Sequence, residues 1–196
     1  AAGPDLFRRD ARGALSAAFA AAEAALRDYY DRSGDGAGTC AVAALLRGRA
    51  LYVANVGDSR ALLVSDSGDP AKPLARALTT DQRASVPTER ARVEGAGGEI
   101  VDGRVLGNLI PSRTLGDFAV KAKCPGAVVM EPDIVRHTLE PRDAFLVLGS
   151  DGVWDVLSNL KVARLVLAAR HPQRACNDLM REVARRKSGD DATVVV

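Results

Sequence analysis

Residues 145–159 read FLVLGSDGVWDVLSN, an apolar run that leads into an Asp-Gly turn. The run 145–148 predicts a buried strand. Asp151 stands just beyond this strand, so its carboxylate projects from a rigid element. Oxygen ligands in such a position suit a hard cation such as Mg²⁺ or Mn²⁺. A turn without any ligand is the simpler alternative, because Asp-Gly turns are common.

A second acidic point is the segment Ser188-Gly189-Asp190-Asp191, directly before the last apolar run. Two adjacent carboxylates repel each other unless positive charge lies nearby. A bound cation would relieve this repulsion, and a solvent-exposed loop is the alternative. Asp81, in Thr79-Thr80-Asp81, is a further acidic residue whose role spacing alone does not indicate.

The rest of the chain mixes helical and strand-like patterns. Apolar residues at spacings of three and four predict a long helix over residues 6–30. Short turns at Gly48 and Gly57 predict an antiparallel meander of strands over residues 39–46, 50–56 and 61–64. The other predicted elements are strands over 74–79, 134–139, 144–149 and 192–196, helices over 87–95, 158–169 and 172–186, and a hairpin over 99–105.

Strands dominate the first half of the sequence and helices cluster late. This order predicts an α+β fold rather than a doubly wound parallel sheet. We expect an antiparallel β-sandwich flanked by helices, in αββα layers, as a single domain over residues 1–196.

The charge balance is close to neutral, with 27 Lys and Arg against 25 Asp and Glu and a formal charge of +2. This balance and 4% aromatic residues argue against nucleic acid as a partner. We interpret the run Arg185-Arg186-Lys187 as the solvated end of a helix. The alanine-rich stretch 14–25 is too short for a membrane span. Three cysteines without metal-ligand or redox spacing favour an intracellular location, cytoplasmic or nuclear.

Eight short segments occur in a fixed order along the chain. They are GTCAV (38–42), LYVANVGDSRALL (51–63), LTTD (78–81), ERARVEGAGGEI (89–100), GRVLGNLIPSRTLGD (103–117), EPDI (131–134), FLVLGSDGVWDVLSN (145–159) and SGDDATVVV (188–196). This series resembles the motif series of the metal-dependent serine/threonine protein phosphatases of type 2C. The resemblance implies hydrolysis of phosphoserine and phosphothreonine in phosphoprotein substrates, by a water that two ions of Mg²⁺ or Mn²⁺ activate.

The resemblance also implies roles for particular residues. By motif match Asp151 and Asp190 are metal ligands, and Gly152 adjoins the first of them. Asp81 corresponds to a weaker third-metal site, to which Asp155 is a further candidate ligand. Asp191 stands where the family usually has asparagine. The region from Gly107 to Pro132 corresponds to the flap that shapes substrate choice, and we expect it to be mobile.

Some parts of the family pattern are missing from this sequence. The DGHGG motif, the first metal-binding carboxylate and the phosphate-binding arginine would all lie upstream of the first helix. We therefore identify no catalytic residue and expect a truncated, phosphatase 2C-like domain, incomplete at the N-terminus. The sequence starts at Ala1 and stops within a predicted strand, which also suggests a fragment. Alone, the chain should bind one metal weakly at most and be inactive, unless a partner or the missing segment completes the sandwich.

Three other functions compete with this interpretation. A pseudophosphatase that serves as a binding or scaffold module would keep the fold and lose the metals. The retention of Asp151 and Asp190 speaks against it. A phosphatase that forms an aspartyl-phosphate would need an Asp-x-Asp motif, which the sequence lacks. A nucleic-acid binder is the poorest fit, because the charge is near neutral and aromatic residues are few.

Overall fold

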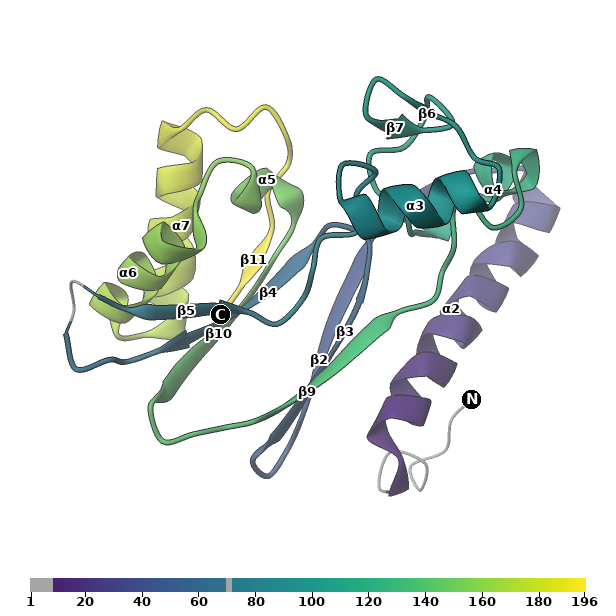
Figure 1. Cartoon of the computed structure of the whole chain (residues 1–196). Helices are drawn as coiled ribbons and strands as arrows, with labels where there is room; N and C mark the ends of the chain where they lie inside the picture. The colour runs from purple at the N-terminus through teal and green to yellow at the C-terminus, as the bar shows by residue number, and fades with distance from the viewer. Residues whose placement is uncertain (1–8, 70–71) are drawn as a thin grey trace. The chain divides into compact units, whose positions relative to one another are not determined.

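The computed structural model describes residues 9–69 and 72–196 (Figure 1). Contacts divide the chain into two compact units. The first unit comprises Ala1–Ala44, Ala54–Asp58 and Asp81–Ile134, and the second comprises Leu45–Val53, Ser59–Thr80 and Val135–Val196. Each unit is therefore discontinuous in sequence, and each has its own packing.

The second unit is built on a four-stranded sheet. Its strands lie in the order β11 (Val194–Val195), β10 (Asp143–Gly149), β4 (Arg60–Ser65) and β5 (Leu74–Ala77). All three pairings are antiparallel, and β10 pairs with β4 from Asp143↔Ser65 to Gly149↔Arg60. Five of the six residues of β4 are buried. The strand predicted at 145–148 is present, but in β10 only Val147 and Gly149 are buried.

Two helices cover one face of this sheet. They are α6 (Asn159–Ala169) and α7 (Pro172–Arg185), which follow the short α5 (Asp151–Trp154). The Ser158 hydroxyl accepts a hydrogen bond from the backbone N–H of Lys161 at 3.3 Å and so caps α6. Arg170 adopts a left-handed conformation that ends α6, and Pro172 begins α7, because proline suits a first helical position.

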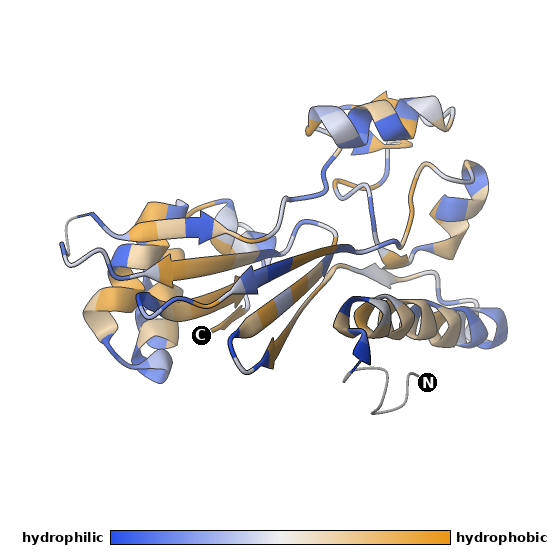
Figure 2. Ribbon diagram, turned by 60° about the horizontal axis from the view of Figure 1, so that its bottom comes forward, coloured by the Kyte–Doolittle hydropathy of each residue, from blue (hydrophilic) through white to orange (hydrophobic). Residues whose placement is uncertain are grey.

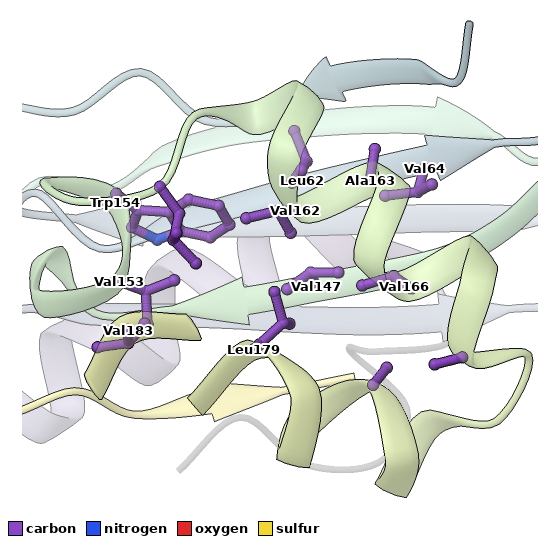
Figure 3. Packing of buried hydrophobic residues seen from close by; sticks show 13 residues of the cluster. Leu62, Val64, Val147, Val153, Trp154, Val162, Ala163, Val166, Leu179 and Val183 are labelled. Carbon is purple, nitrogen blue, oxygen red and sulfur yellow. The ribbon is translucent and has the colours of Figure 1, made fainter. Parts of the chain in front are cut away.

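The core of the second unit lies between the helices and the sheet (Figure 3). Leu62, Val64 and Val147 belong to β4 and β10, and they pack with Val166 and Leu179 of α6 and α7. All five side chains are fully buried. Burying a side chain of this size contributes roughly 1.5–3 kcal/mol, so this cluster holds the helical layer to the sheet.

The first unit packs around the long helix α2 (Ala11–Ser33), which Asp10 caps at 2.9 Å from the backbone N–H of Gly13. Figure 2 shows much of α2 in pale orange, because alanine dominates it. The remaining elements are β1 (Gly38–Thr39), α3 (Pro87–Gly95), β6 (Ile100–Val101), β7 (Arg104–Val105), β8 (Leu115–Gly116) and α4 (Phe118–Lys123). β1 pairs with β8, and β6 with β7. A small core forms from Val93, Val105 and Val128.

A three-stranded sheet has the order β2 (Ala41–Arg47), β3 (Ala50–Val56) and β9 (Asp133–Thr138), and each strand contributes residues to both units. The predicted meander is wrong in its last step. β9 takes the place beside β3, and β4 belongs to the four-stranded sheet. Gly57 lies between β3 and β4 with φ of 99°, so the chain leaves one sheet there and enters the other.

The α+β class with antiparallel sheets and flanking helices is confirmed. Helix α3 has the predicted bounds, and the hairpin around Asp102 and Gly103 is present. The first helix extends to Ser33 rather than residue 30, and the start predicted for it at residue 6 lies outside the described residues. Within the described ranges, no helix is long and apolar enough to cross a membrane.

Candidate metal centre

Asp151 lies where the strand β10 turns into α5. It is the first residue of α5 and is half-buried, and Ser150 precedes it as the helix cap. One carboxylate oxygen of Asp151 accepts a hydrogen bond from the backbone N–H of Gly152 at 3.0 Å. The sheet therefore fixes the position of this carboxylate, as the sequence predicted.

The second acidic segment is held against this junction. The backbone N–H of Ser150 donates to the carbonyl of Thr193 at 3.1 Å, and the N–H of Thr193 donates to the Ser150 hydroxyl at 3.0 Å. The Ser188 hydroxyl donates to the carbonyl of Gly152 at 3.0 Å. These bonds bring the loop of Asp190 to the residues around Asp151, although 39 positions separate them in the sequence.

Gly152 has a steric reason to be glycine. A Cβ atom at this position would collide with the backbone carbonyl oxygen of Asp191. Any side chain would therefore push the acidic loop away from α5. Its carbonyl already accepts the Ser188 hydroxyl, so the structure gives Gly152 a packing role. A contact between Gly152 and a metal stays a prediction.

The donor set fits a hard cation but is small. Asp190 is exposed, and one of its carboxylate oxygens accepts the N–H of Asp191 at 2.8 Å. Together with Asp151 it offers carboxylate oxygens, which Mg²⁺ and Mn²⁺ prefer. Among residues 9–69 and 72–196, no group of three or more His, Cys, Asp or Glu side chains could hold a metal ion. A metal site at Asp151 and Asp190 therefore stays a prediction.

Asp155 lies at the C-terminal end of α5, is exposed, and donates its N–H to the carbonyl of Asp151 at 2.8 Å. Arg60, at the start of β4, lies opposite Gly149 in the sheet. Its guanidinium lies 5.1 Å from the centre of the Trp154 ring and donates to the Asn159 side chain at 2.8 Å. Arg60 therefore links α5 to α6 and places positive charge beside the helix that begins at Asp151 and ends before Asp155. No sequence pattern indicated this role.

Asp81 belongs to the first unit, where its neighbour Gln82 is fully buried. The Gln82 side chain accepts the N–H of Gly57 at 2.7 Å and donates to the Asp133 carboxylate at 2.9 Å. These bonds fix the backbone beside Asp81, which is itself half-buried. Its assignment to a third metal stays a prediction.

The region from Gly107 to Pro132 contains β8 and α4, and a buried ionic network holds it to α3. Both Glu89 oxygens are used, one by Arg113 at 2.6 Å and the other by the Ser112 hydroxyl at 2.7 Å and by Arg92 at 2.9 Å. Arg92 also donates to the carbonyls of Ser112 and Gly126, both at 2.8 Å. The base of the expected flap is therefore anchored, and its mobility stays a prediction.

Electrostatics follow from this network. Burial alone would raise the pKa of Glu89, but hydrogen bonds from Arg113, Ser112 and Arg92 outweigh it and lower the pKa to about 2. The pKa of Arg113 is raised, because its bond to Glu89 and the nearby Asp133 outweigh its burial. Glu89 is therefore a carboxylate at every physiological pH.

A second buried cluster, which the sequence analysis missed, lies in the second unit. The Asp143 carboxylate accepts hydrogen bonds from the Ser65 hydroxyl at 2.6 Å and the backbone N–H of Glu140 at 2.8 Å, and His137 Nε2 lies within hydrogen-bond distance of it at 2.9 Å. Burial opposes the charge, but these three contacts lower the pKa of Asp143. His137 lies in strand β9, as predicted. The residues of this cluster are far apart in the sequence, so no local motif indicated that they would meet.

Comparison with known proteins identifies the family. The sequence profile of the family Protein phosphatase 2C matches residues 4–192. The "Probable protein phosphatase 2C 57" of Oryza sativa subsp. japonica is 36% identical over 199 residues, which cover 97% of this chain and 53% of that protein. The "Probable protein phosphatase 1N" of Mus musculus is 45% identical over 161 residues, which cover 79% of this chain and 38% of that protein. The chain belongs to the protein phosphatase 2C family.

Solved structures agree on the fold. A sex determining protein of C. elegans superposes with a TM-score of 0.80 at 24% identity, over 93% of this chain and 45% of that one. The serine-threonine phosphatase 2C of Toxoplasma gondii superposes with a TM-score of 0.74 at 21% identity, over 98% of this chain and 69% of that one. The chain spans about half the length of the curated relatives it matches.

Proposed function

We propose that this chain is part of the catalytic domain of a Mg²⁺- or Mn²⁺-dependent phosphatase that hydrolyses phosphoserine and phosphothreonine in proteins. One observation carries the proposal within the family. The loop of Asp190 and Asp191 is hydrogen-bonded to the β10–α5 junction that carries Asp151, and Gly152 leaves the space it needs. Two carboxylates on hydrogen-bonded segments would supply part of the oxygen ligands that a hard cation needs.

The chain's own residues would hold and orient the metal. Asp151 and Asp190 supply negative oxygen ligands, and Arg60 keeps α5 in place through Trp154 and Asn159. When bound, Mg²⁺ or Mn²⁺ would supply Lewis acidity toward the phosphate ester and a more acidic water as nucleophile. The Glu89 network would keep the base of the region 107–132 fixed while substrate binds.

We propose that the chain by itself binds one metal ion at most, weakly, and has negligible activity. Two ions bring four positive charges, which Asp151 and Asp190 neutralise only in part. A general acid contributes typically about 10²- to 10⁴-fold to a rate, and we identify none in this chain. The activity is therefore proposed for a longer protein that contains this chain.

Metal binding can be tested without any turnover, because Trp154 is the single tryptophan of the sequence and lies in the same helix as Asp151. Excitation of Trp154 should sensitise Tb³⁺ luminescence, and added Mn²⁺ should compete. Asp151→Asn and Asp190→Asn should each lower the affinity for Tb³⁺, measured by this luminescence, by at least tenfold. Asp31→Asn, an exposed aspartate on α2, is the matched control and should leave binding unchanged.

Two glycine substitutions test the geometry of the loop. Gly152→Ala should displace the acidic loop and abolish Tb³⁺ binding, whereas Gly189→Ala should preserve it, because a Cβ there would meet nothing within 4 Å. Equal binding by both variants would contradict the proposed centre.

The enzymatic proposal needs the longer, natural protein. A phosphopeptide assay should show turnover with Mn²⁺ that a chelator abolishes. A natural protein that binds no metal and lacks activity would instead support the pseudophosphatase alternative.

We also propose an intracellular location. Cys40, Cys124 and Cys176 form no disulfide in the part of the chain that the structure describes, which suits a reducing compartment. Thiol labelling of the protein from gently lysed cells should modify all three residues, and recovery of a disulfide-linked species would contradict the proposal.

A further inference from the structure

The helical layer of the second unit has a net positive charge that the rest of the chain does not share. Residues 159–187 contain eight basic and two acidic residues, a formal charge of +6, whereas the whole chain has +2. The rest of the chain therefore has a formal charge of −4. We call this set the basic helical surface, and its basic members are Lys161, Arg164, Arg170, Arg174, Arg181, Arg185, Arg186 and Lys187.

The cations of this surface point into solvent, while the two carboxylates lie beneath them. The side chains of Arg174, Arg181 and Arg185 are 71%, 75% and 67% exposed. Those of Asp178 and Glu182 are 26% and 11% exposed. An approaching molecule therefore meets guanidinium groups before it meets a carboxylate.

The two carboxylates cannot neutralise so many cations. Glu182 contacts Arg185 at 2.8 Å, Arg186 at 3.2 Å and Lys161 at 3.6 Å. Asp178 contacts Arg181 at 2.8 Å and Arg174 at 3.7 Å. Each carboxylate is shared by two or three cations, so the basic helical surface keeps an excess of positive charge.

The titration of Glu182 agrees with this excess. The hydrogen bond from Arg185 is the main cause that lowers the pKa of Glu182 to about 2, and Arg186 and Lys161 add to it. Glu182 therefore stays ionised at all physiological pH values. The surface keeps its net positive charge across this range.

We propose that the basic helical surface binds an extended, Asp- and Glu-rich segment of a partner protein. Arginines make up six of the eight cations, and their planar forks pair with carboxylates in a bidentate way. The 14 residues of α7 span about 21 Å, the length of roughly six extended residues. A short acidic strand of peptide thus matches the row of arginines in length and charge.

Two other classes of partner fit this surface less well. A helix that lies in a membrane surface needs an exposed apolar face, but Ala175, Leu179 and Val183 of α7 are buried in the core. Single-stranded nucleic acid is bound through aromatic side chains that stack on bases. Residues 159–187 contain no Phe, Tyr or Trp.

The test measures binding of the full chain to a fluorescein-labelled hexapeptide of alternating Asp and Glu, by fluorescence anisotropy. The variant Arg174→Gln/Arg181→Gln/Arg185→Gln removes three exposed cations. Three lost ion pairs of about 0.5 kcal/mol each correspond to roughly tenfold weaker binding. The control Arg90→Gln/Arg104→Gln/Arg136→Gln removes the same charge from exposed residues of other elements and should leave affinity within twofold.

Raising NaCl from 25 to 200 mM should weaken binding further, because exposed pairs are screened. Circular dichroism checks that each variant folds, and Arg181→Gln alone, at the most exposed position, should weaken binding about two- to threefold. Three results would overturn the proposal: no binding of the peptide, an equal loss in both triple variants, or equal or tighter binding to phosphatidylserine vesicles or to DNA. The test does not involve metal or phosphatase activity, so it is independent of the proposed function.

Discussion

Substitution of Glu89 by glutamine should destabilise the first unit strongly. The Glu89 side chain is only 7% exposed and is bound by Arg92 at 2.9 Å and by Arg113 at 2.6 Å. Its pKa falls from an ordinary 4.5 to about 2. Each unit of pKa shift corresponds to 1.36 kcal/mol, so the carboxylate contributes roughly 3 kcal/mol at pH 7. Removing one partner of a buried ion pair typically costs about 3–5 kcal/mol, which agrees.

The pH dependence has a definite sign. Because the folded pKa is depressed, the stabilisation is fully present above pH 4.5 and is lost as the pH falls toward 2. The difference between wild type and Glu89→Gln should therefore shrink to roughly half by pH 3. Urea unfolding followed by circular dichroism at pH 7 and pH 3 measures both values.

Glu94→Gln is the matched control on the same helix. Glu94 is 53% exposed and pairs with Arg90 at 3.1 Å, so its loss should cost about 0.5 kcal/mol or less. A Glu89→Gln variant within about 1 kcal/mol of wild type at pH 7 would refute the argument that this network anchors α3 to residues 112–113. A difference that does not change between pH 7 and pH 3 would refute the assignment to ionisation.

Asp143→Asn should destabilise the second unit at neutral pH, since Ser65, Glu140 and His137 all contact the carboxylate and lower its pKa. The difference should narrow as the pH falls below the ordinary value of 3.8, while Asp69→Asn, an exposed control, should show no such narrowing in urea unfolding. Leu179→Ala should cost about 2–5 kcal/mol, because it opens a cavity between α7 and the sheet. Leu160→Ala, at a side chain that is 50% exposed, should cost under about 1 kcal/mol in the same experiment, and similar costs for the two would contradict the packing in Figure 3.

Local sequence patterns predicted most of the elements. Helix α3 has its predicted bounds because Pro87 favours a first helical turn and Gly95 ends the periodic segment. Strand β10 was visible in the apolar run 145–148, and the tight turn at Asp102-Gly103 identified the hairpin. These signals act over a few residues, so the sequence alone contains them.

Pairing between strands was harder to predict. The sequence placed 61–64 in a meander with 50–56, but β4 pairs with β10, about 80 residues later in the chain. Short turns favour neighbours in sequence, yet β4 pairs with β10 on one side and β5 on the other, and α6 packs against it. Such long-range packing leaves little trace in a local pattern.

For the candidate centre, the sequence by itself predicted two carboxylates as metal ligands, Asp151 and Asp190, and its motifs indicated the family to which the chain belongs. Only the tertiary structure decided that the segments carrying them are hydrogen-bonded to each other, through Ser150 with Thr193 and Ser188 with Gly152. It also decided that Gly152 must lack a side chain and that Glu89 gathers two arginines. The physical reason is that hydrogen bonds and steric contacts depend on distances in space, which residue spacing along a chain does not specify.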